Sequence, residues 1–357
     1  MLSRLDFLSA KAAPLIGLDI STAAVKMLEL SQAGPDAYTV ERYWIEPLPQ
    51  DAVVEGNIAN LEETGEVVKR AWQHMGSRIR NVAMALPAAA VITKKVIIPT
   101  LERDEDIEAQ VETEANQYIP FTLDEVNLDF QVIGPAPSGA EEMEVLIAAA
   151  RKERVEDRVA VAQAAGLKPT VMDVESYALL AAMALVEKQL PEVTEQIIAV
   201  VDIGAAVMRI TVQHKGQAVY MREQQVGGNQ LSQEIMRQFS VTLEEAESNK
   251  KSGNLPDSYQ ADVLNPFVEK LALEVARALQ FFFTSTPFSK VDQIALAGGC
   301  ATLDGLQEAI AHRTHVNSFV ANPFAKMTVS SRIKASQLVL DAPSLLVACG
   351  LALRRFE

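Results

Sequence analysis

The sequence contains few cysteines, and this shortage argues against two kinds of small protein. Its 357 residues include only Cys300 and Cys349, so a disulfide-stabilised secreted scaffold and a cysteine-based zinc module are both unexpected. We expect the two thiols to be reduced and buried, because cysteine is among the residues most often found inside proteins. The four histidines are predicted on the surface, since no nearby cysteine or carboxylate completes a zinc set: His74, His214, His312 and His315.

Positive charge is also in short supply. The chain has 32 lysine and arginine residues against 47 aspartate and glutamate residues, which gives a formal net charge of -15. An acidic surface repels phosphate backbones, so nucleic acid is not an expected partner. Direct adsorption to anionic lipid is disfavoured for the same reason.

Long apolar runs are not expected in this chain, since no segment approaches the roughly 18 apolar residues that a membrane span requires. The longest candidate, Tyr177–Val186, is predicted to be a buried helix. The N-terminus carries Arg4, Asp6 and Lys11 among short apolar groups, so it lacks the core of a signal peptide. These features predict a cytoplasmic protein that reaches a membrane only through a partner. The sequence leaves open whether residues 1–13 are ordered, although short unpaired termini usually are not.

The composition that remains is that of a soluble globular protein, with 49% hydrophobic and 22% charged residues in a chain long enough for two domains. An internal repeat supports two domains. Leu15–Leu30 and Ile197–Val212 each contain an apolar run, an Asp-Ile pair, a few small residues and a second run rich in β-branched side chains. This pattern predicts a strand, a tight turn and a returning strand. A hairpin at the start of each half indicates two domains built on one plan.

Helical and strand patterns alternate between and after the two hairpins. In the first half they predict helices at 62–75, 104–118 and 153–165, and strands at 81–86, 91–98, 126–133 and 143–149. In the second half they predict helices at 229–239, 243–250, 266–284 and 343–355, and a buried strand at 291–297. The chain is therefore predicted to be α/β, with the strand-rich region before Gly166 as an inserted subdomain.

The two hairpin turns contain residues suited to binding phosphate. Asp19 and Asp202 each follow an apolar strand, where a carboxylate can hold Mg²⁺ through water molecules. The small residues after each aspartate allow backbone N–H groups to approach phosphate oxygens. Lys26 lies on the returning strand, within reach of a phosphate as a point charge. Either hairpin alone has a simpler interpretation, a strand-end aspartate without a ligand, but two such hairpins favour a site between them.

Three further segments are candidates for holding a nucleoside. Gly298–Gly299 connects a buried strand to a helix and would permit close contact with a ring or ribose, although a tight turn without a ligand explains it equally well. Glu247 and Lys250 form an i, i+3 pair on a predicted helix, which is either a ribose contact or a solvated pair. Gly227–Asn229 is either a loop facing the phosphates or base, or a helix start capped by Asn229.

These elements, in this order, resemble the actin, Hsp70 and sugar-kinase superfamily. The connecting helices of that superfamily match Asp173–Ala182 and Pro343–Ala352. Within it the chain is most similar to the FtsA family and, more closely, to the PilM family. The insertion from about Ala88 to Gly166 is similar to the small subdomain of both families, and Glu114–Phe121 is similar to a PilM signature of that subdomain.

The resemblance implies an actin-like (ribonuclease H-like) two-lobed α/β fold with a small inserted α+β subdomain. Residues 1–87 and 167–196 would form the first lobe, and 88–166 the insertion. Residues 197–357 would form the second lobe, in which 228–290 would be the helical part that faces the nucleotide.

The resemblance also implies ATP and Mg²⁺ between the lobes. The nucleotide contacts that it implies come from both: Asp19, Ser21, Lys26, Asp202, Gly204, Ala205, Gly228, Asn229, Glu247, Lys250, Gly298 and Gly299. Asp19 and Asp202 would hold the metal through water. The implied partner is the cytoplasmic N-terminal tail of PilN, with the pilus motor ATPases and self-association as further possibilities. The implied role is a scaffold of the type IV pilus assembly platform, peripheral to the inner membrane.

Turnover of ATP is left open by this sequence. The second hairpin has Ala205 and Ala206 where a hydroxyl residue often contacts phosphate, and the first has Ser21 where glycine is common. Hydrolysis needs a residue that positions the attacking water. Glu175 is the one candidate, and it is equally well explained as a carboxylate at a helix start. The alternative functions are an FtsA-like filament-forming ATPase, which the chain end at Arg354–Glu357 disfavours because no separate membrane-targeting tail follows, and a small-molecule kinase.

Overall fold

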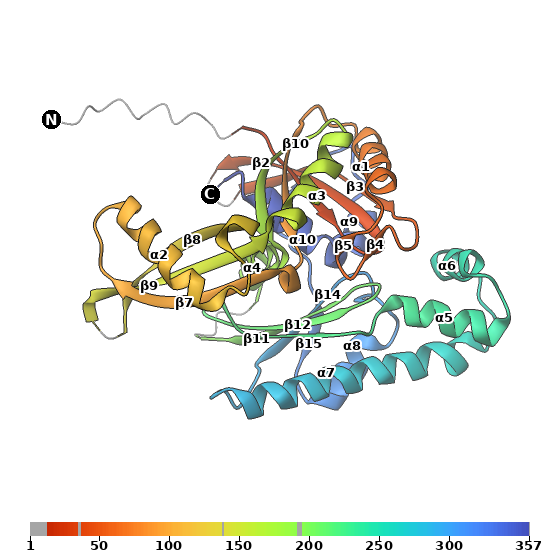
Figure 1. Cartoon of the computed structure of the whole chain (residues 1–357). Helices are drawn as coiled ribbons and strands as arrows, with labels where there is room; N and C mark the ends of the chain where they lie inside the picture. The colour runs from red at the N-terminus through yellow and green to blue at the C-terminus, as the bar shows by residue number, and fades with distance from the viewer. Residues whose placement is uncertain (1–12, 35–36, 138, 191–194, 357) are drawn as a thin grey trace.

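A computed structural model of the chain describes residues 13–34, 37–137, 139–190 and 195–356, so the open question about residues 1–13 falls almost wholly outside the described residues. Two larger sheets lie one above the other in Figure 1, with helices between and around them. A small third sheet projects to one side.

The first sheet has six strands in the order β10-β6-β1-β2-β3-β16. Their bounds are β1 Ile16–Ile20, β2 Ala24–Gly34, β3 Ala37–Pro47, β6 Asn81–Leu86, β10 Lys168–Val174 and β16 Thr328–Val329. A two-stranded ribbon, β4 (Val53–Val54) with β5 (Asn57–Ile58), follows β3. The helices α1 (Leu61–Met75) and α3 (Lys152–Ala164) share a core with one face of this sheet.

The small sheet has the order β7-β9-β8, with β7 at Val91–Pro99, β8 at Val126–Ala136 and β9 at Gly139–Arg151. The helix α2 (Asp104–Tyr118) shares its separate core. The strand β8 extends to Ala136 and β9 begins at Gly139, and these two residues still pair, so both strands are longer than the predicted 126–133 and 143–149. The helix α3, predicted within the insertion, packs with α1 instead. The lobe boundaries themselves stay a prediction.

The second sheet has five strands in the order β13-β12-β11-β14-β15. Their bounds are β11 Ile197–Ile203, β12 Met208–His214, β13 Gln217–Gln224, β14 Gln293–Ala297 and β15 Ser318–Val320. One face shares a core with α5 (Gly228–Phe239), α7 (Asn265–Ser285) and α8 (Leu306–Thr314). The helix α6 (Leu243–Ser252) contacts α5 at the edge of the molecule.

Two helices form a layer between the larger sheets. The helices α4 (Glu175–Glu187) and α10 (Leu346–Leu353) share one core with residues of both sheets, for example Leu28 of β2 and Val200 of β11. Since α10 comes from the end of the chain, the C-terminal segment returns to the first sheet, where β16 also pairs with β3. The middle layer, formed by α4 and α10, therefore packs against both of the sheets that contain the predicted hairpins.

From the sequence we expect no segment that is long and apolar enough to span a membrane. When only length and composition are considered, this expectation is wrong. Among the described residues, Ala335–Leu353 is one helical stretch that is long and apolar enough, with a mean hydropathy of 1.6. It consists of α9 (Ala335–Asp341), a short 3-10 turn and α10, and its polar residues and Pro343 conceal its continuity in the sequence. In the structure 61% of this window is buried, as in a core helix of a soluble protein.

Candidate functional site

Side-chain alternation along β1 and β11 places the aspartates of both hairpins on the sheet faces that border the middle layer. Side chains alternate between the faces of a strand. Ile16, Leu18 and Ile20 of β1 lie in the core with α1 and α3, so Asp19 lies on the opposite face. In β11, Ile198 and Val200 lie in the core with α4 and α10, so Asp202 shares that face. The two carboxylates, which the sequence predicts at facing turns, therefore point into the same layer from opposite sheets.

Each aspartate has a basic residue directly opposite it in its hairpin. Asp19 pairs in register with Lys26, and the Lys26 Nζ atom lies 3.0 Å from Asp19 Oδ2. Asp202 pairs in register with Arg209. Both bases follow their aspartate by seven residues, so the repeat seen in the sequence extends to a basic residue placed opposite the aspartate in each hairpin. Arg209 is absent from the sequence-based site, and its equivalence to Lys26 is the signal that could have identified it.

The two turns close in the same way. The Ser21 N–H donates to the Ala24 carbonyl at 3.0 Å, and the Gly204 N–H donates to the Val207 carbonyl at 3.0 Å. The Ser21 hydroxyl also donates to the Ala24 carbonyl, at 2.9 Å. Both donors of Ser21 therefore stabilise the turn, which leaves its oxygen as an acceptor. Its predicted phosphate contact stays a prediction.

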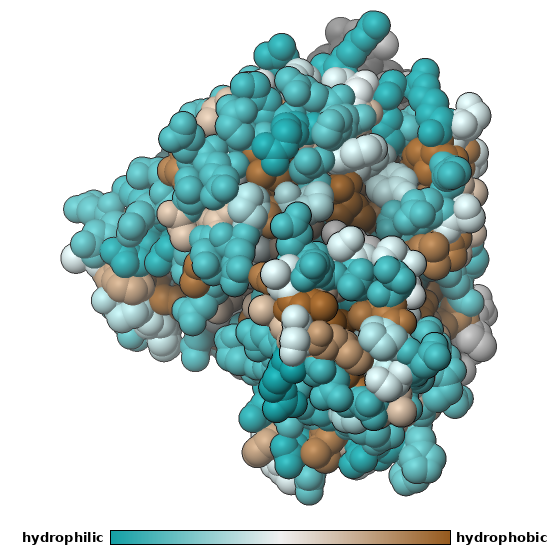
Figure 2. Space-filling model, turned by 90° about the vertical axis from the view of Figure 1, so that its right-hand side faces the viewer, coloured by the Kyte–Doolittle hydropathy of each residue, from teal (hydrophilic) through white to brown (hydrophobic). Residues whose placement is uncertain are grey.

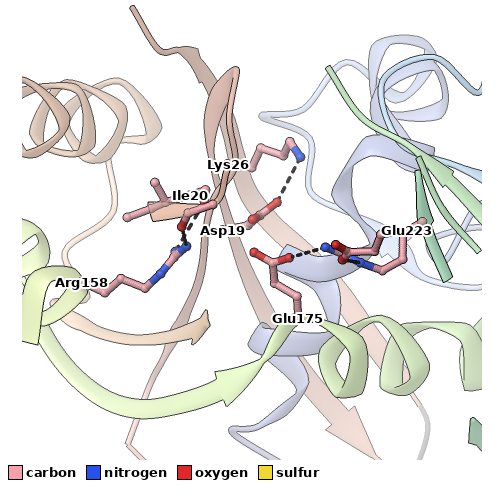
Figure 3. Close-up of polar contacts among 8 residues, drawn as sticks. Asp19, Ile20, Lys26, Arg158, Glu175 and Glu223 are labelled. Carbon is pink, nitrogen blue, oxygen red and sulfur yellow. Dashed lines mark hydrogen bonds and ion pairs between the residues drawn. The ribbon is translucent and has the colours of Figure 1, made fainter. Parts of the chain in front are cut away.

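The two hairpins meet electrostatically at Lys26. Burial is the largest influence on this ammonium and lowers its pKa, but the carboxylates of Asp19, Asp202 and Glu175 together outweigh burial and raise the pKa. Lys26 therefore stays charged, with carboxylates of both hairpins and of α4 around it. Figure 3 shows Asp19, Lys26 and Glu175 pointing toward this common region.

Two of these carboxylates are held in an environment unfavourable to their charge. Burial raises the pKa of Asp202 although Arg209 and Lys26 oppose the shift. Burial also raises the pKa of Glu175, against the effects of Arg209 and Arg158. Among the described residues, no hydrogen bond or ion pair at contact distance ends on the Asp202 carboxylate. A cation near Asp202 would relieve this cost, which is the electrostatic setting expected at a ligand site.

Arg209 connects α4 to the second sheet. Its Nη2 atom lies 3.2 Å from Glu175 Oε2, and its Nε atom donates to Glu223 Oε1 at 2.7 Å. All three side chains are largely shielded from water. Because Glu175 is the first residue of α4, the ion pair fixes that helix end beside the second hairpin.

Arg158 of α3 supports the first hairpin from behind. Its guanidinium donates to the Ile20 carbonyl at 3.4 Å and to the Gly56 carbonyl at 2.9 Å, and the side chain is buried (Figure 3). It thereby links the end of β1 to the β4–β5 ribbon. The sequence gives no signal for this residue, since its two acceptors are backbone groups far away in the chain.

The N-terminus of α5 is occupied by the second hairpin. The Gly228 N–H donates to the Gly204 carbonyl at 3.0 Å, and the Asn229 N–H donates to the Ala205 carbonyl at 2.8 Å. A Cβ atom on Gly227 would lie 2.6 Å from the same two carbonyl oxygens, so glycine allows this approach. The interpretation of Asn229 as the helix cap is wrong, because Gly227 occupies that position without a side-chain bond. The Asn229 side chain is exposed and free of that role.

Glu247 and Lys250 form the predicted pair, and a third residue joins them. The Lys250 Nζ atom lies 2.7 Å from Glu247 Oε1 and donates to the Ser232 hydroxyl at 2.6 Å. Ser232, buried on α5, also bonds to Glu247. The pair influences the pKa of the Cys300 thiol, which places it near the Gly298–Gly299 turn. The network fixes α6 to α5, and its nucleoside contact stays a prediction.

The two glycines of that turn differ in what surrounds them. Gly298 has a φ of +85°, and a Cβ atom there would lie 2.4 Å from the Ile203 carbonyl oxygen and 2.5 Å from Asp202 Oδ1. Gly298 is therefore required for the turn to pack against the second hairpin. A Cβ atom on Gly299 would meet nothing within 4 Å, and this residue is exposed. Gly299 is the one of the two that borders open space.

The donor set fits a cation held through water. Among the residues that the structure describes, no three His, Cys, Asp or Glu side chains gather closely enough to bind a metal directly. Asp19 and Asp202, from opposite sheets, are instead hard oxygen donors of the kind that leaves Mg²⁺ much of its water shell. The arrangement as a whole combines two turns, a charged lysine and two carboxylates, as binding of a magnesium polyphosphate requires.

Similarity to known proteins agrees with this geometry. Residues 17–356 match the model of the family described as type IV pilus assembly protein PilM. The structure titled PilM-PilN type IV pilus biogenesis complex matches with a TM-score of 0.80 and 29% identity, covering 97% of this chain and 99% of the other.

More distant matches show the fold alone. The ethanolamine utilization protein EutJ from Carboxydothermus hydrogenoformans matches with a TM-score of 0.57 and 18% identity, covering 95% of this chain and 88% of the other. MreB5 of Spiroplasma citri bound to ADP matches with a TM-score of 0.51 and 15% identity, covering 95% of each chain. The predicted actin-like two-lobed fold is confirmed. With the match of the family model over nearly its whole length, the chain belongs to the PilM family of type IV pilus assembly proteins.

Proposed function

We propose that the chain is a cytoplasmic ATP-binding scaffold of the type IV pilus platform, peripheral to the inner membrane through its partners. It binds the cytoplasmic tail of PilN and links the platform to the pilus motor, and so supports twitching motility. The observation that carries the nucleotide part is the position of Lys26, which has Asp19 of one hairpin and Asp202 of the other around it.

ATP would be held by residues of both lobes. Asp19 and Asp202 would hold Mg²⁺ through water, and Lys26 would contact a phosphate oxygen. The backbone of Gly204 and Ala205 borders the phosphates in this proposal, while Gly299 permits close approach of the nucleoside. Mg²⁺ would neutralise part of the triphosphate charge beside the two aspartates.

The inserted subdomain supplies the proposed partner surface. The insertion is rich in apolar strand residues such as Val96, Ile97 and Ile98, which suits peptide docking better than sugar recognition. Of these three, Val96 and Ile98 lie in the core of the small sheet, and only Ile97 is exposed, at 52%. Tyr118, within the signature at the end of α2, is also exposed, at 45%, and Lys94 lies 4.9 Å from its ring centre. A contiguous exposed apolar patch marks a protein contact, and Ile97 and Tyr118 are the proposed members of such a patch.

Binding of a synthetic PilN tail tests the partner part of the proposal. Titration of the purified chain with the peptide, with and without MgATP, should give saturable binding. Tyr118→Glu should weaken that binding by about tenfold or more, because it replaces an exposed aromatic anchor with a charge.

Leu340→Glu is the matched control, since Leu340 is exposed to 61% on α9, away from the insertion. It should leave peptide binding unchanged. Absence of peptide binding in both conditions would remove the PilN claim. A loss caused by Leu340→Glu and not by Tyr118→Glu would move the docking surface away from the insertion.

Figure 2 shows the side of the molecule on which Figure 1 places α5 and α6. Most of this face is hydrophilic, and hydrophobic residues are visible in a hollow near its centre. A largely polar face with limited apolar exposure is compatible with a soluble scaffold that presents its partner surface elsewhere.

A further inference from the structure

The ion pair between Glu175 and Arg209 engages the one carboxylate that the sequence offers as a candidate for positioning the attacking water. Glu175 starts α4 and lies in the electrostatic field of both Asp19 and Asp202, which places it at the proposed phosphate site. Its Oε2 atom is 3.2 Å from Arg209, and both side chains are at most 14% exposed. Burial raises the pKa of Glu175, but the positive charge of Arg209 beside Oε2 acts to lower that pKa, which makes this carboxylate a weaker base toward a water molecule than it would be without Arg209.

Arg209 is itself held from a second side. Glu223 of β13 accepts from Arg209 Nε at 2.7 Å, so the guanidinium bridges two carboxylates. The planar, forked guanidinium suits such bridging, which the single ammonium of a lysine cannot reproduce. Arg209 therefore has a fixed position within the second hairpin, and Glu175 is bound to a rigid partner.

The same face of β12 contacts the other end of α4. Arg209 and Gln213 lie four residues apart on one face of the strand. The Gln213 side chain donates a hydrogen bond to the carboxylate of Glu187, which is the last residue of α4. Between them, the buried Thr211 hydroxyl has no hydrogen-bond partner among the described residues. The helix is thus joined to β12 by polar contacts at both ends. Movement of the second sheet against α4 would separate Glu175 from Arg209.

We propose that Arg209 is a positioning residue that withholds Glu175 from the attacking water, so that the chain retains ATP until movement of β12 against α4 breaks the ion pair. The proposal rests on the nucleotide site proposed above. In the released state, the oxygen of a water hydrogen-bonded to Glu175 forms a bond to the γ-phosphorus. The bond between that phosphorus and the bridging oxygen breaks, and ADP, inorganic phosphate and one proton leave.

The test compares Arg209→Gln, Arg209→Lys and the double variant Arg209→Gln with Glu175→Gln. Arg209→Gln should raise the rate of phosphate release from ATP by about tenfold or more, the order of effect of a freed base. The Kd for ATP, measured by calorimetry on the same samples, should change by a much smaller factor than the rate of phosphate release. The double variant should lose the gain, and Arg209→Lys should give an intermediate rate.

A second readout needs no nucleotide. If Glu175 and Arg209 are coupled, the shifts in melting temperature of Arg209→Gln and of the single variant Glu175→Gln should not add up to that of the double variant. Arg42→Gln is the matched control, because Arg42 lies 3.8 Å from Glu29 in another cross-strand pair away from the site. Its rate of phosphate release should equal that of the unmodified chain.

The outcomes separate the two proposals. If neither the unmodified chain nor Arg209→Gln binds ATP, the proposed function fails. If both bind ATP and Arg209→Gln releases phosphate no faster, the withholding role of Arg209 is wrong. If Arg209→Gln does not fold, Arg209→Lys provides the test. An unchanged rate of phosphate release in that variant would overturn the proposal in the same way.

Discussion

Arg209 lies directly opposite Asp202 in the β11–β12 ladder, seven residues after it, as Lys26 lies opposite Asp19 in the first hairpin. The two bases differ in their partners. Lys26 pairs with the aspartate of its own hairpin, whereas Arg209 pairs with Glu175 and Glu223. The hairpins are therefore equivalent in backbone and register, and the second one leaves its aspartate without a contact ion pair among the described residues.

Replacement of Asp202 by asparagine should stabilise the free protein and weaken its binding of MgATP. Burial raises the pKa of Asp202, so the free energy of unfolding falls as the pH rises from the unfolded-state pKa through the folded-state pKa, and the neutral amide avoids that cost. Melting temperature should rise at neutral pH and the difference should shrink on acidification. Affinity for MgATP should fall by about tenfold or more, as for loss of one interaction with a charged group.

Asp292→Asn is a control variant for which we expect the melting temperature to change in the opposite direction. Burial alone would raise the pKa of Asp292, but hydrogen bonds from the Ile197 N–H and from Lys290 outweigh it and lower the pKa. Its ionised form therefore stabilises the fold above the unfolded-state pKa, and this stabilisation is lost as the pH falls through the folded-state pKa. Asp292→Asn should lower the melting temperature at neutral pH. A decrease for both variants would contradict the electrostatic account of Asp202.

The two glycines of the β14 turn should separate folding from ligand binding. Gly298→Ala places a Cβ atom against the Ile203 carbonyl and Asp202, at a positive φ, and should lower the free energy of unfolding by about 1–3 kcal/mol. Gly299→Ala adds its Cβ atom to open space and should leave stability unchanged. If Gly299 borders the nucleoside, that variant should bind ATP more weakly. Equal melting temperatures for both variants would contradict the packing described here.

The two cysteines should be unreactive in the folded chain. Burial raises the pKa of the Cys300 thiol to about 11, and burial also raises the pKa of Cys349. At pH 8 a thiol with that Cys300 pKa is ionised in roughly one molecule in a thousand, and the thiolate is the reactive form. A chromogenic disulfide reagent should therefore release almost no colour until denaturant is added, and then two equivalents per chain. Rapid reaction of one native thiol would show that this part of the core is accessible.

Much of the fold is predictable from the spacing of apolar residues. The pattern predicts β6 and α2 with the bounds that the structure has, and α1, α3 and α5 within a residue at each end. These elements have one buried face each, so their period appears in the sequence. The pattern misses β3, β10 and β13, because their alternation is interrupted or because one face is only partly buried.

The charge pairs of the site are less accessible to sequence reasoning. Asp19, Lys26 and Asp202 can be located because the repeat marks the strand ends. Glu247 and Lys250 can be paired because they are three residues apart on one helix. Arg158 and Ser232 cannot be found in that way, since their partners come from distant elements that only the fold brings together. The return of β16 to β3 is a two-residue pairing, too short to leave a pattern.

Calorimetric titration of the purified, folded chain with ATP, in Mg²⁺ and in EDTA, tests the central claim most directly. Two hairpins that face one layer, with Lys26 between Asp19 and Asp202, predict one nucleotide per chain. Affinity should fall when Mg²⁺ is removed or when Lys26 is replaced by alanine. Absence of binding heat at ATP concentrations up to about 1 mM, where even an affinity of roughly -4 kcal/mol would register, would contradict the account.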